Sequence, residues 1–375
     1  MKTNSNLLPL AVAVALITPL AAAVAAAATD TANVKPDPVP DQTERGPFLF
    51  SYFLGNGDGL HLAYSTDGLQ MTPLNGGKIY LKPSIGNGLM RDPCIRQGDD
   101  GVYHLVWTTG WWDKGFGVSS SPDLIHWGPQ RYVEVNKDNP SAVNTWAPEL
   151  FYNDQKQEWM IFWATTIPGK FAETEINGGK GDSGPSKTQS LNHRIYYVTT
   201  KDFETFSDPK LLVDPGFNCI DATMVKLPAG AASPLAGKYV MVIKDETFAP
   251  QPKKNLRVLS ADSPEGPWSA ASEPITKDWV EGPSIARVGD AWYVYYDEYR
   301  NHTYGAVRTK DFRTFEVVNE NFSFPAGARH GTVFPVAATV LERLKTAIPI
   351  NLPNTPPANE SRGPSTAPST TPKTN

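Results

Sequence analysis

Three carboxylates and one histidine begin short apolar segments that lie far apart in the chain: Asp92, Asp221, Glu281 and His330. Carboxyl groups held close together cannot all ionise freely, so one tends to keep its proton while another stays charged. Such a set can donate and accept protons in one reaction. An acid before a proline also caps turns, so each residue alone has a structural explanation. The chemistry therefore depends on whether the fold brings them together.

A short pattern recurs five times and indicates how the fold could do so. Each copy follows strand-like runs and consists of a polar turn and a bulky apolar or aromatic residue; the copies are 65–69, 121–127, 200–206, 261–268 and 309–315. Internal repeats at intervals of about 40–50 residues are typical of radial or stacked arrays. Short strands and the lack of a long helical period favour an all-β propeller.

We predict an all-β, five-bladed β-propeller. Four blades come from consecutive strands, within 92–133, 146–213, 221–275 and 281–318, and the last strand of the third blade is expected near 270–275. The fifth blade combines an innermost strand at 330–336 with N-terminal strands at 48–54, 60–65 and 79–81. This closure by both chain ends would hide the exposed sheet edges.

Propeller geometry predicts where the chemistry lies. The first strand of each blade lines the central channel, so the acids and His330 should converge at one mouth of it. Loops from second to third strands emerge on the same face, and they carry Trp111, Trp112 and a polar insert at 167–192. Three acids that repel one another at a shared, partly buried centre are usually retained for function.

These segments resemble glycoside hydrolase family 43, whose members are five-bladed propellers. The matching pieces appear in family order over about residues 45–340: Arg91-Asp92-Pro93-Cys94-Ile95, Trp146-Ala147-Pro148-Glu149-Leu150, Ile220-Asp221-Ala222, Val280-Glu281-Gly282-Pro283-Ser284-Ile285 and Arg329-His330-Gly331-Thr332. The resemblance implies that Asp92 is the general base and Glu281 the general acid. It also implies that Asp221 adjusts the pKa of the general acid and orients it. Glu149 receives no role.

The resemblance also implies a set of contacts around these acids. We expect the substrate to meet Trp111, Trp112, Trp146 and Arg329. His330 matches a central histidine that in some members helps to hold a calcium ion or its waters, so no cofactor is required but calcium is allowed. Opposed positions of Asp92 and Glu281 across the channel leave room for a water molecule, which predicts an inverting reaction.

The expected function is a secreted, inverting glycoside hydrolase that removes arabinofuranosyl or xylosyl units from plant polysaccharides or oligosaccharides. Three alternatives stay open. One is a β-galactosidase or exo-galactanase on the same scaffold, and another is a carbohydrate-binding propeller without turnover. The third is a phosphorylase, which would need a cationic cluster from Arg91, Arg300 and Arg329 to hold phosphate.

The chain ends and the composition set further bounds. An apolar run within residues 1–28 predicts a secretory signal peptide, with an uncleaved anchor as the alternative, so the protein is expected to be secreted or periplasmic. The Pro/Ser/Thr-rich segment 346–375 is expected to be disordered. A net charge of -5 without a basic stripe argues against nucleic-acid binding. The expected partner is a saccharide, with no membrane contact after signal removal.

Overall fold

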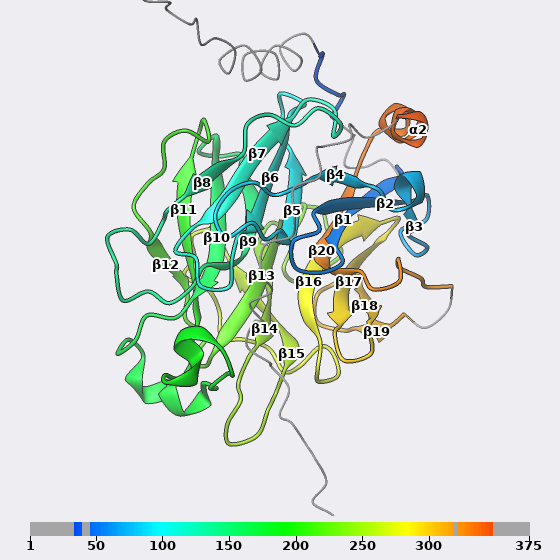
Figure 1. Cartoon of the computed structure of the whole chain (residues 1–375). Coiled ribbons are helices and arrows are strands. Elements are labelled where there is room, and N and C mark those ends of the chain that lie inside the picture. The colour runs from blue at the N-terminus through cyan, green and yellow to red at the C-terminus, as the bar shows by residue number, and fades with distance from the viewer. Residues whose placement is uncertain (1–33, 40–45, 319–320, 348–375) are drawn as a thin grey trace, which may run out of the picture.

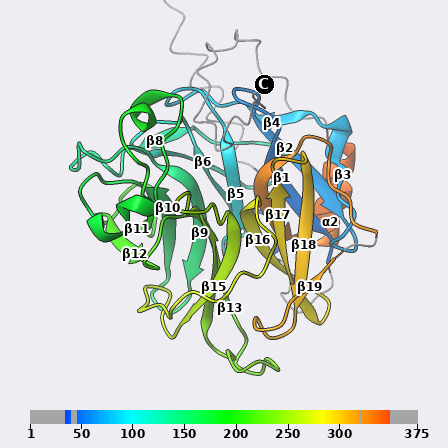
Figure 2. The same cartoon turned by 90° about the horizontal axis from the view of Figure 1, so that it is seen from below.

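The structure is a computed structural model, and it describes residues 34–39, 46–318 and 321–347. The predicted signal peptide at 1–28 and all but the first two residues of the predicted tail lie outside these residues. Within the described part, the strands form five sheets. Figures 1 and 2 show these sheets side by side around a common centre. The all-β propeller prediction is confirmed.

Four sheets are built from consecutive strands, each with its first strand innermost. One contains β5 (Arg91–Gln97), β6 (Tyr103–Thr108), β7 (Phe116–Ser121) and β8 (Arg131–Val133); the next contains β9 (Trp146–Asn153), β10 (Glu158–Thr165), β11 (Arg194–Thr200) and β12 (Lys210–Val213). The third contains β13 (Cys219–Lys226), β14 (Tyr239–Asp245) and β15 (Asn255–Ala261), and the fourth contains β16 (Glu281–Val288), β17 (Ala291–Glu298), β18 (Thr303–Thr309) and β19 (Glu316–Val317).

The fifth sheet joins the two ends of the chain, as predicted. Its innermost strand is β20 (Arg329–Pro335), which pairs antiparallel with β1 (Phe48–Phe53). β1 continues to β2 (Leu60–Ser65), and both β3 (Thr72–Pro73) and β4 (Ile79–Leu81) pair with β2. β20 also packs between β16 and β5, so it closes the ring of inner strands.

The recurring sequence pattern is a side-chain-stabilised turn. In the second blade, the Asp202 carboxylate accepts the backbone N–H groups of Glu204 and Thr205, and the Thr200 hydroxyl accepts that of Phe203. Asp67, Asp123 and Asp311 accept backbone N–H groups two and three residues ahead in the same way. Short polar side chains of this kind replace backbone partners in tight turns. The repeat therefore marks the same turn in four blades.

The third blade departs from the prediction, because no fourth strand forms at 270–275. The segment does run beside β15, and the N–H groups of Ser269, Ser272 and Ile275 donate to β15 carbonyls. The return bonds differ, since β15 N–H groups donate to the hydroxyls of Ser269, Ser272 and Thr276. Side-chain oxygens thus take the place of backbone carbonyls and prevent a regular ladder.

An α-helix near the C-terminal end of the described residues was absent from the prediction. α2 (Ala338–Thr346) follows β20 directly and buries Val340, Leu341 and Leu344 against the blade-five core. Its Arg343 forms an ion pair with the buried Asp37 carboxylate, which fastens the N-terminal segment to the helix. Its three apolar contacts are too few for a clear helical period in the sequence. No helix among the described residues is long and apolar enough to cross a membrane.

Candidate active site

The inner strands share a kink near their first residues, and this kink positions the acids. Strand pairing shifts register between Arg91 and Cys94, between Ile220 and Thr223, and between Glu281 and Ser284. At the kink, Asp92 and Asp221 both have φ 52° and Gly282 has φ 59°. Such β-bulges re-aim side chains at the ends of strands. Here they direct the acids to the mouth of the channel.

The sequence suggested that the three acids occupy equivalent positions on their strands. In the structure they do not. Asp92 and Asp221 are the left-handed residues of their strands, whereas Glu281 precedes the left-handed Gly282 by one residue. A Cβ atom on Gly282 would lie 2.4 Å from Cγ of His330. Glycine is therefore required both by the positive φ and by the close approach of the imidazole. Glu281 projects from the position that Arg91 holds in its own blade.

His330 lies between two of the acids. Its Nδ1 is 3.4 Å from Oδ1 of Asp92 and 3.9 Å from Oδ2 of Asp221. Asp92 also accepts a 2.8 Å hydrogen bond from the Thr108 hydroxyl, and Asp221 accepts one of 3.0 Å from the backbone N–H of Gly282. The predicted convergence of Asp92, Asp221 and His330 is therefore present in the structure.

Burial and charge shift the proton affinities of this group. Burial raises the pKa of Asp221 to about 6, although His330 and Lys244 oppose the shift. For His330, burial alone would lower the pKa, but the nearby Asp221 and Asp92 carboxylates outweigh it and raise the pKa above 6.5. Asp221 can thus hold a proton close to neutral pH, and His330 favours its cationic form.

Glu281 is held by two cations. The Lys244 ammonium lies 2.9 Å from Oε2 of Glu281, and the Arg329 guanidinium lies 2.9 Å from Oε1. Burial alone would raise the pKa of Glu281, yet Lys244 and Arg329 lower it to about 2. In this state Glu281 is an ionised carboxylate. The expectation that neighbours and burial would raise its pKa is wrong for this arrangement, because two cations outweigh both.

The two ion pairs that hold Glu281, from Lys244 and Arg329, form a clamp. The clamp belongs to a row of alternating charges. On one side, Nε of Arg329 is 2.6 Å from the buried Asp297. On the other, Lys244 is 2.8 Å from Glu246, which in turn pairs with Lys254. Sequence reasoning missed Lys244, Asp297, Glu246 and Lys254. The available signal was a charged residue at the end of an apolar second strand, as in Tyr239–Asp245, which the strand order places at the mouth.

Arg329 is held by two carboxylates, because its Nε donates to Asp297 and its Nη2 donates to Glu281. Its contact with substrate stays a prediction. The other two arginines considered for phosphate are also placed in separate contacts. Arg91 lies over the rings of Phe53 and Trp111, and Arg300 stacks on Trp279. Burial, and to a smaller extent the Arg329 cation, lower the pKa of Arg91, so these two cations lie near each other, whereas Arg300 is held in a contact of its own.

The predicted aromatic residues form a connected group beside the acids. The indole N–H of Trp146 donates to the carbonyl of Trp111 at 2.7 Å, and the Trp146 ring contacts both Trp111 and Trp112 with centroids 5.9 Å apart. All three are half-buried. The backbone N–H of Ala147, next to Trp146, donates to the Thr108 hydroxyl that also binds Asp92. The aromatic group is therefore linked to the carboxylates through one hydroxyl.

Glu149 and His330 bear on the calcium expectation. Glu149 is buried and takes hydrogen bonds from Arg96 and Thr223, so it ties three inner strands together. His330 faces two carboxylates, which raise the pKa of its imidazole. A protonated imidazole is a hydrogen-bond donor and not a metal ligand. No group of three or more His, Cys, Asp or Glu side chains is arranged to hold a metal ion within residues 34–39, 46–318 and 321–347. These residues do not fit a directly bound calcium ion, and an indirect contact of His330 with calcium through water stays a prediction.

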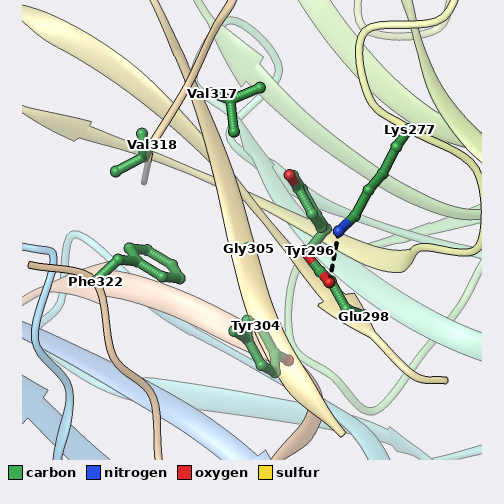
Figure 3. Close-up of a pocket in the computed structure, with 8 residues that line it drawn as sticks. All are labelled: Lys277, Tyr296, Glu298, Tyr304, Gly305, Val317, Val318 and Phe322. Atoms are coloured by element: carbon green, nitrogen blue, oxygen red, sulfur yellow. Dashed lines mark hydrogen bonds and ion pairs between the residues drawn. The ribbon is translucent and has the colours of Figure 1, made fainter. Parts of the chain in front are cut away.

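A separate hollow lies on the outer part of the fourth blade. Figure 3 shows its lining, with Lys277 reaching the Glu298 carboxylate near Tyr296, Tyr304 and Phe322. It contains none of the three acids. This hollow is therefore separate from the predicted site at the central mouth.

Comparisons with known proteins identify the family to which this chain is similar. A family described as "Probable glycosyl hydrolase domain", of the family 43-related type, matches residues 44–342. A curated α-L-arabinofuranosidase from Bifidobacterium longum subsp. longum is 24% identical over 170 residues, which is 41% of this chain. The chain spans only 15% of the length of that relative.

Solved structures give more distant similarities. A thermostable family-43 glycoside hydrolase is 15% identical with a TM-score of 0.47, covering 64% of this chain and 78% of the other. An α-L-arabinofuranosidase from Lactobacillus brevis is 16% identical with a TM-score of 0.44, covering 61% and 72%. An exo-β-1,3-galactanase from Phanerochaete chrysosporium is 10% identical with a TM-score of 0.44, covering 64% and 53%.

Proposed function

Because the chain belongs to the family 43-related glycosyl hydrolases, we propose that it is an inverting hydrolase that removes terminal arabinofuranosyl or xylosyl units from plant polysaccharides or oligosaccharides. The observation that carries this proposal is the cluster of Asp92, Asp221 and Glu281 around His330, in which Asp221 and Glu281 differ in proton affinity. A glycosidase needs one carboxyl that donates a proton and one that accepts a proton.

Asp92 is the proposed general base. Thr108 donates to one of its oxygens, and His330 faces the other. These contacts fix the orientation of the carboxylate that is proposed to take a proton from water. In a single displacement, Asp92 takes that proton while the water oxygen bonds to the anomeric carbon and the glycosidic C–O bond breaks on the opposite face.

Glu281 is the proposed general acid, and it must gain a proton before it can give one to the leaving oxygen. Lys244 opposes this in the present arrangement, but its ammonium has a second carboxylate, Glu246, at 2.8 Å. A shift of Lys244 toward Glu246 on substrate binding would weaken the clamp and raise the pKa of Glu281. The nearby Asp221, whose pKa is already about 6, is the competing donor.

The choice of sugar rests on one curated similarity, to an α-L-arabinofuranosidase. A β-galactosidase or exo-galactanase on the same scaffold is the second candidate. A binding propeller without turnover is the third, and it is disfavoured because a lectin has no need for carboxyl groups of such different proton affinity. We also propose that the chain is secreted or periplasmic, which mass spectrometry of the mature N-terminus would test.

The function is tested with nitrophenyl arabinofuranoside, xyloside and galactoside, followed by ¹H NMR of the first product from the best substrate. We expect turnover of the arabinofuranoside or the xyloside, and a first product with the anomeric configuration opposite to the substrate. Asp92→Asn protein prepared in parallel controls for contaminating hydrolases. Retention of configuration would contradict the single displacement, and turnover of the galactoside alone would favour the second candidate.

A further inference from the structure

A second pocket lies beside the carboxylates, beneath the polar insert at 167–192. Its lining joins blades two and three with the insert: Trp146, Gly179, Lys180, Gly181, Leu191, His193, Asn218, Glu246, Phe248 and Lys254. The insert contains the short helices η2 (Ala172–Asn177) and η3 (Gly184–Lys187), drawn in green at the lower left of Figure 1. The backbone N–H of Phe248 donates to the carbonyl of Asn177, which fastens the insert to blade three.

Two contacts connect this pocket with the proposed reaction centre. Glu246, in the pocket wall, and Glu281 share the Lys244 ammonium, at 2.8 Å and 2.9 Å. Trp146, also in the lining, precedes Ala147, whose N–H shares the Thr108 hydroxyl with Asp92. The pocket is therefore adjacent to the reacting groups without containing any of the three acids.

His193 gives the pocket a defined hydrogen-bonding character. Its Nδ1 lies 3.1 Å from Oδ1 of Asn218, and the Asn218 amide is oriented by donation from Nδ2 to the carbonyl of Glu246. Because Oδ1 can only accept, Nδ1 must carry the proton. Burial lowers the pKa of His193 to about 4, so the ring is neutral at pH 7. Nε2 is then an acceptor.

This acceptor has no hydrogen-bond partner among the described protein atoms, although His193 is only 1% exposed. Buried polar groups in native proteins are nearly always paired, so such an atom calls for a donor. The Trp146 ring lies 4.8 Å from the imidazole, centroid to centroid, and offers an apolar face. A hydroxyl beside a ring with C–H faces matches both features. Carboxylate and sulfate groups at neutral pH carry no proton to donate.

We propose that this pocket binds a neutral sugar unit next to the one being cleaved, and that a hydroxyl of this sugar donates to Nε2 of His193. The inference rests on the proposed hydrolase function and adds a binding site with a stated preference for uncharged sugars. It assigns the insert at 167–192 the role of forming one wall of that site.

The test compares KM for nitrophenyl monosaccharides, whose aglycone has no hydroxyl to donate to Nε2 of His193, with KM for the trisaccharide of the same sugar. His193→Phe removes the acceptor, and we expect KM for the trisaccharide to rise roughly 3–10-fold, the equivalent of one hydrogen bond. The monosaccharide constants should stay unchanged. The matched control is His104→Phe, since His104 is also a buried imidazole with a pKa lowered to about 4, but it packs on Phe203 in another part of the propeller.

A second measurement needs no variant. In ¹⁵N-labelled protein, saturation with a neutral trisaccharide should shift the Nε2 resonance of His193, and a trisaccharide bearing a uronic acid at the relevant unit should bind more weakly. An unchanged Nε2 resonance while the trisaccharide is hydrolysed would overturn the inference and leave the proposed function standing. A shift on binding without any hydrolysis would support the sugar site and contradict the hydrolase function. Pairing of Nε2 with water only, unaffected by sugar, would also overturn the inference.

Discussion

The two sides of the carboxylate cluster are held by different partners. On one side Asp92 and Asp221 share a single imidazole, that of His330. On the other side Glu281 is gripped by the full cations of Lys244 and Arg329. Burial pushes both Asp221 and Glu281 toward the protonated form, yet the pKa is about 6 for one and about 2 for the other. Neighbouring charge, not burial, therefore decides which carboxyl holds a proton.

The largest expected effect is a loss of kcat that depends on the kind of substrate for Glu281 but not for Asp92. Asp92→Asn should lose roughly 10²–10⁴-fold in kcat on natural oligosaccharides and on nitrophenyl glycosides alike, because water must be activated in both cases. Glu281→Gln should lose a similar factor on oligosaccharides but less on nitrophenyl glycosides, whose leaving group needs little protonation. Steady-state kinetics on both substrate kinds checks this. Equal losses for Glu281→Gln on both kinds would contradict its role as proton donor.

An intermediate effect tests the clamp itself. Lys244→Met leaves Glu281 and Glu246 with one cation each, and breaking a buried pair costs about 3 kcal/mol or more of the free energy of unfolding. Because the pKa of Glu281 is lowered from 4.5 to about 2, its contribution to stability is present above pH 4.5 and is lost as the pH falls toward 2. The loss of unfolding free energy caused by Lys244→Met should therefore be smaller at pH 3 than at pH 7. Denaturant unfolding of both proteins at the two pH values measures it.

The same variant should move the alkaline limb of kcat/KM to higher pH, because Glu281 then keeps its proton more easily. The control is Lys226→Met, which removes a surface ion pair with Asp154 and a contact with the Tyr239 ring and should cost about 1 kcal/mol without moving the limb. An unchanged pH profile for Lys244→Met would mean that the clamp does not set the proton affinity of Glu281.

The smallest effect is a titration that leaves the fold intact. In ¹³C-carboxyl-labelled protein, Asp221 should titrate near pH 6, whereas Glu281 should show no transition above about pH 3. The raised pKa of Asp221 means that its contribution to stability is full below pH 3.8 and is lost as the pH rises through about 6. Asp221→Asn should remove the transition near pH 6. If that transition survives the substitution, another acid, such as Asp297, is its source.

Much of the architecture could be predicted from residues alone. The turn that follows an outer strand depends on contacts within a few residues, as between Thr200, Asp202 and Thr205, so its repetition was visible in the sequence. Strand alternation and the propeller rule then placed Asp92, Asp221 and His330 at one mouth. The missing fourth strand of blade three was not predictable in this way, because serine hydroxyls competing for β15 donors leave the strand-like pattern unchanged.

The sequence by itself determined that three acids and one histidine would meet at the centre, because strand order and antiparallel pairing are encoded locally and repeat along the chain. Only the tertiary structure decided their charge states. Lys244, Arg329 and Glu281 come from three different blades, and the Coulomb energy of an ion pair depends on separation and burial that no local pattern contains. The pocket beneath the insert has the same origin, since His193 acquires its acceptor character from Asn218, which is 25 residues away.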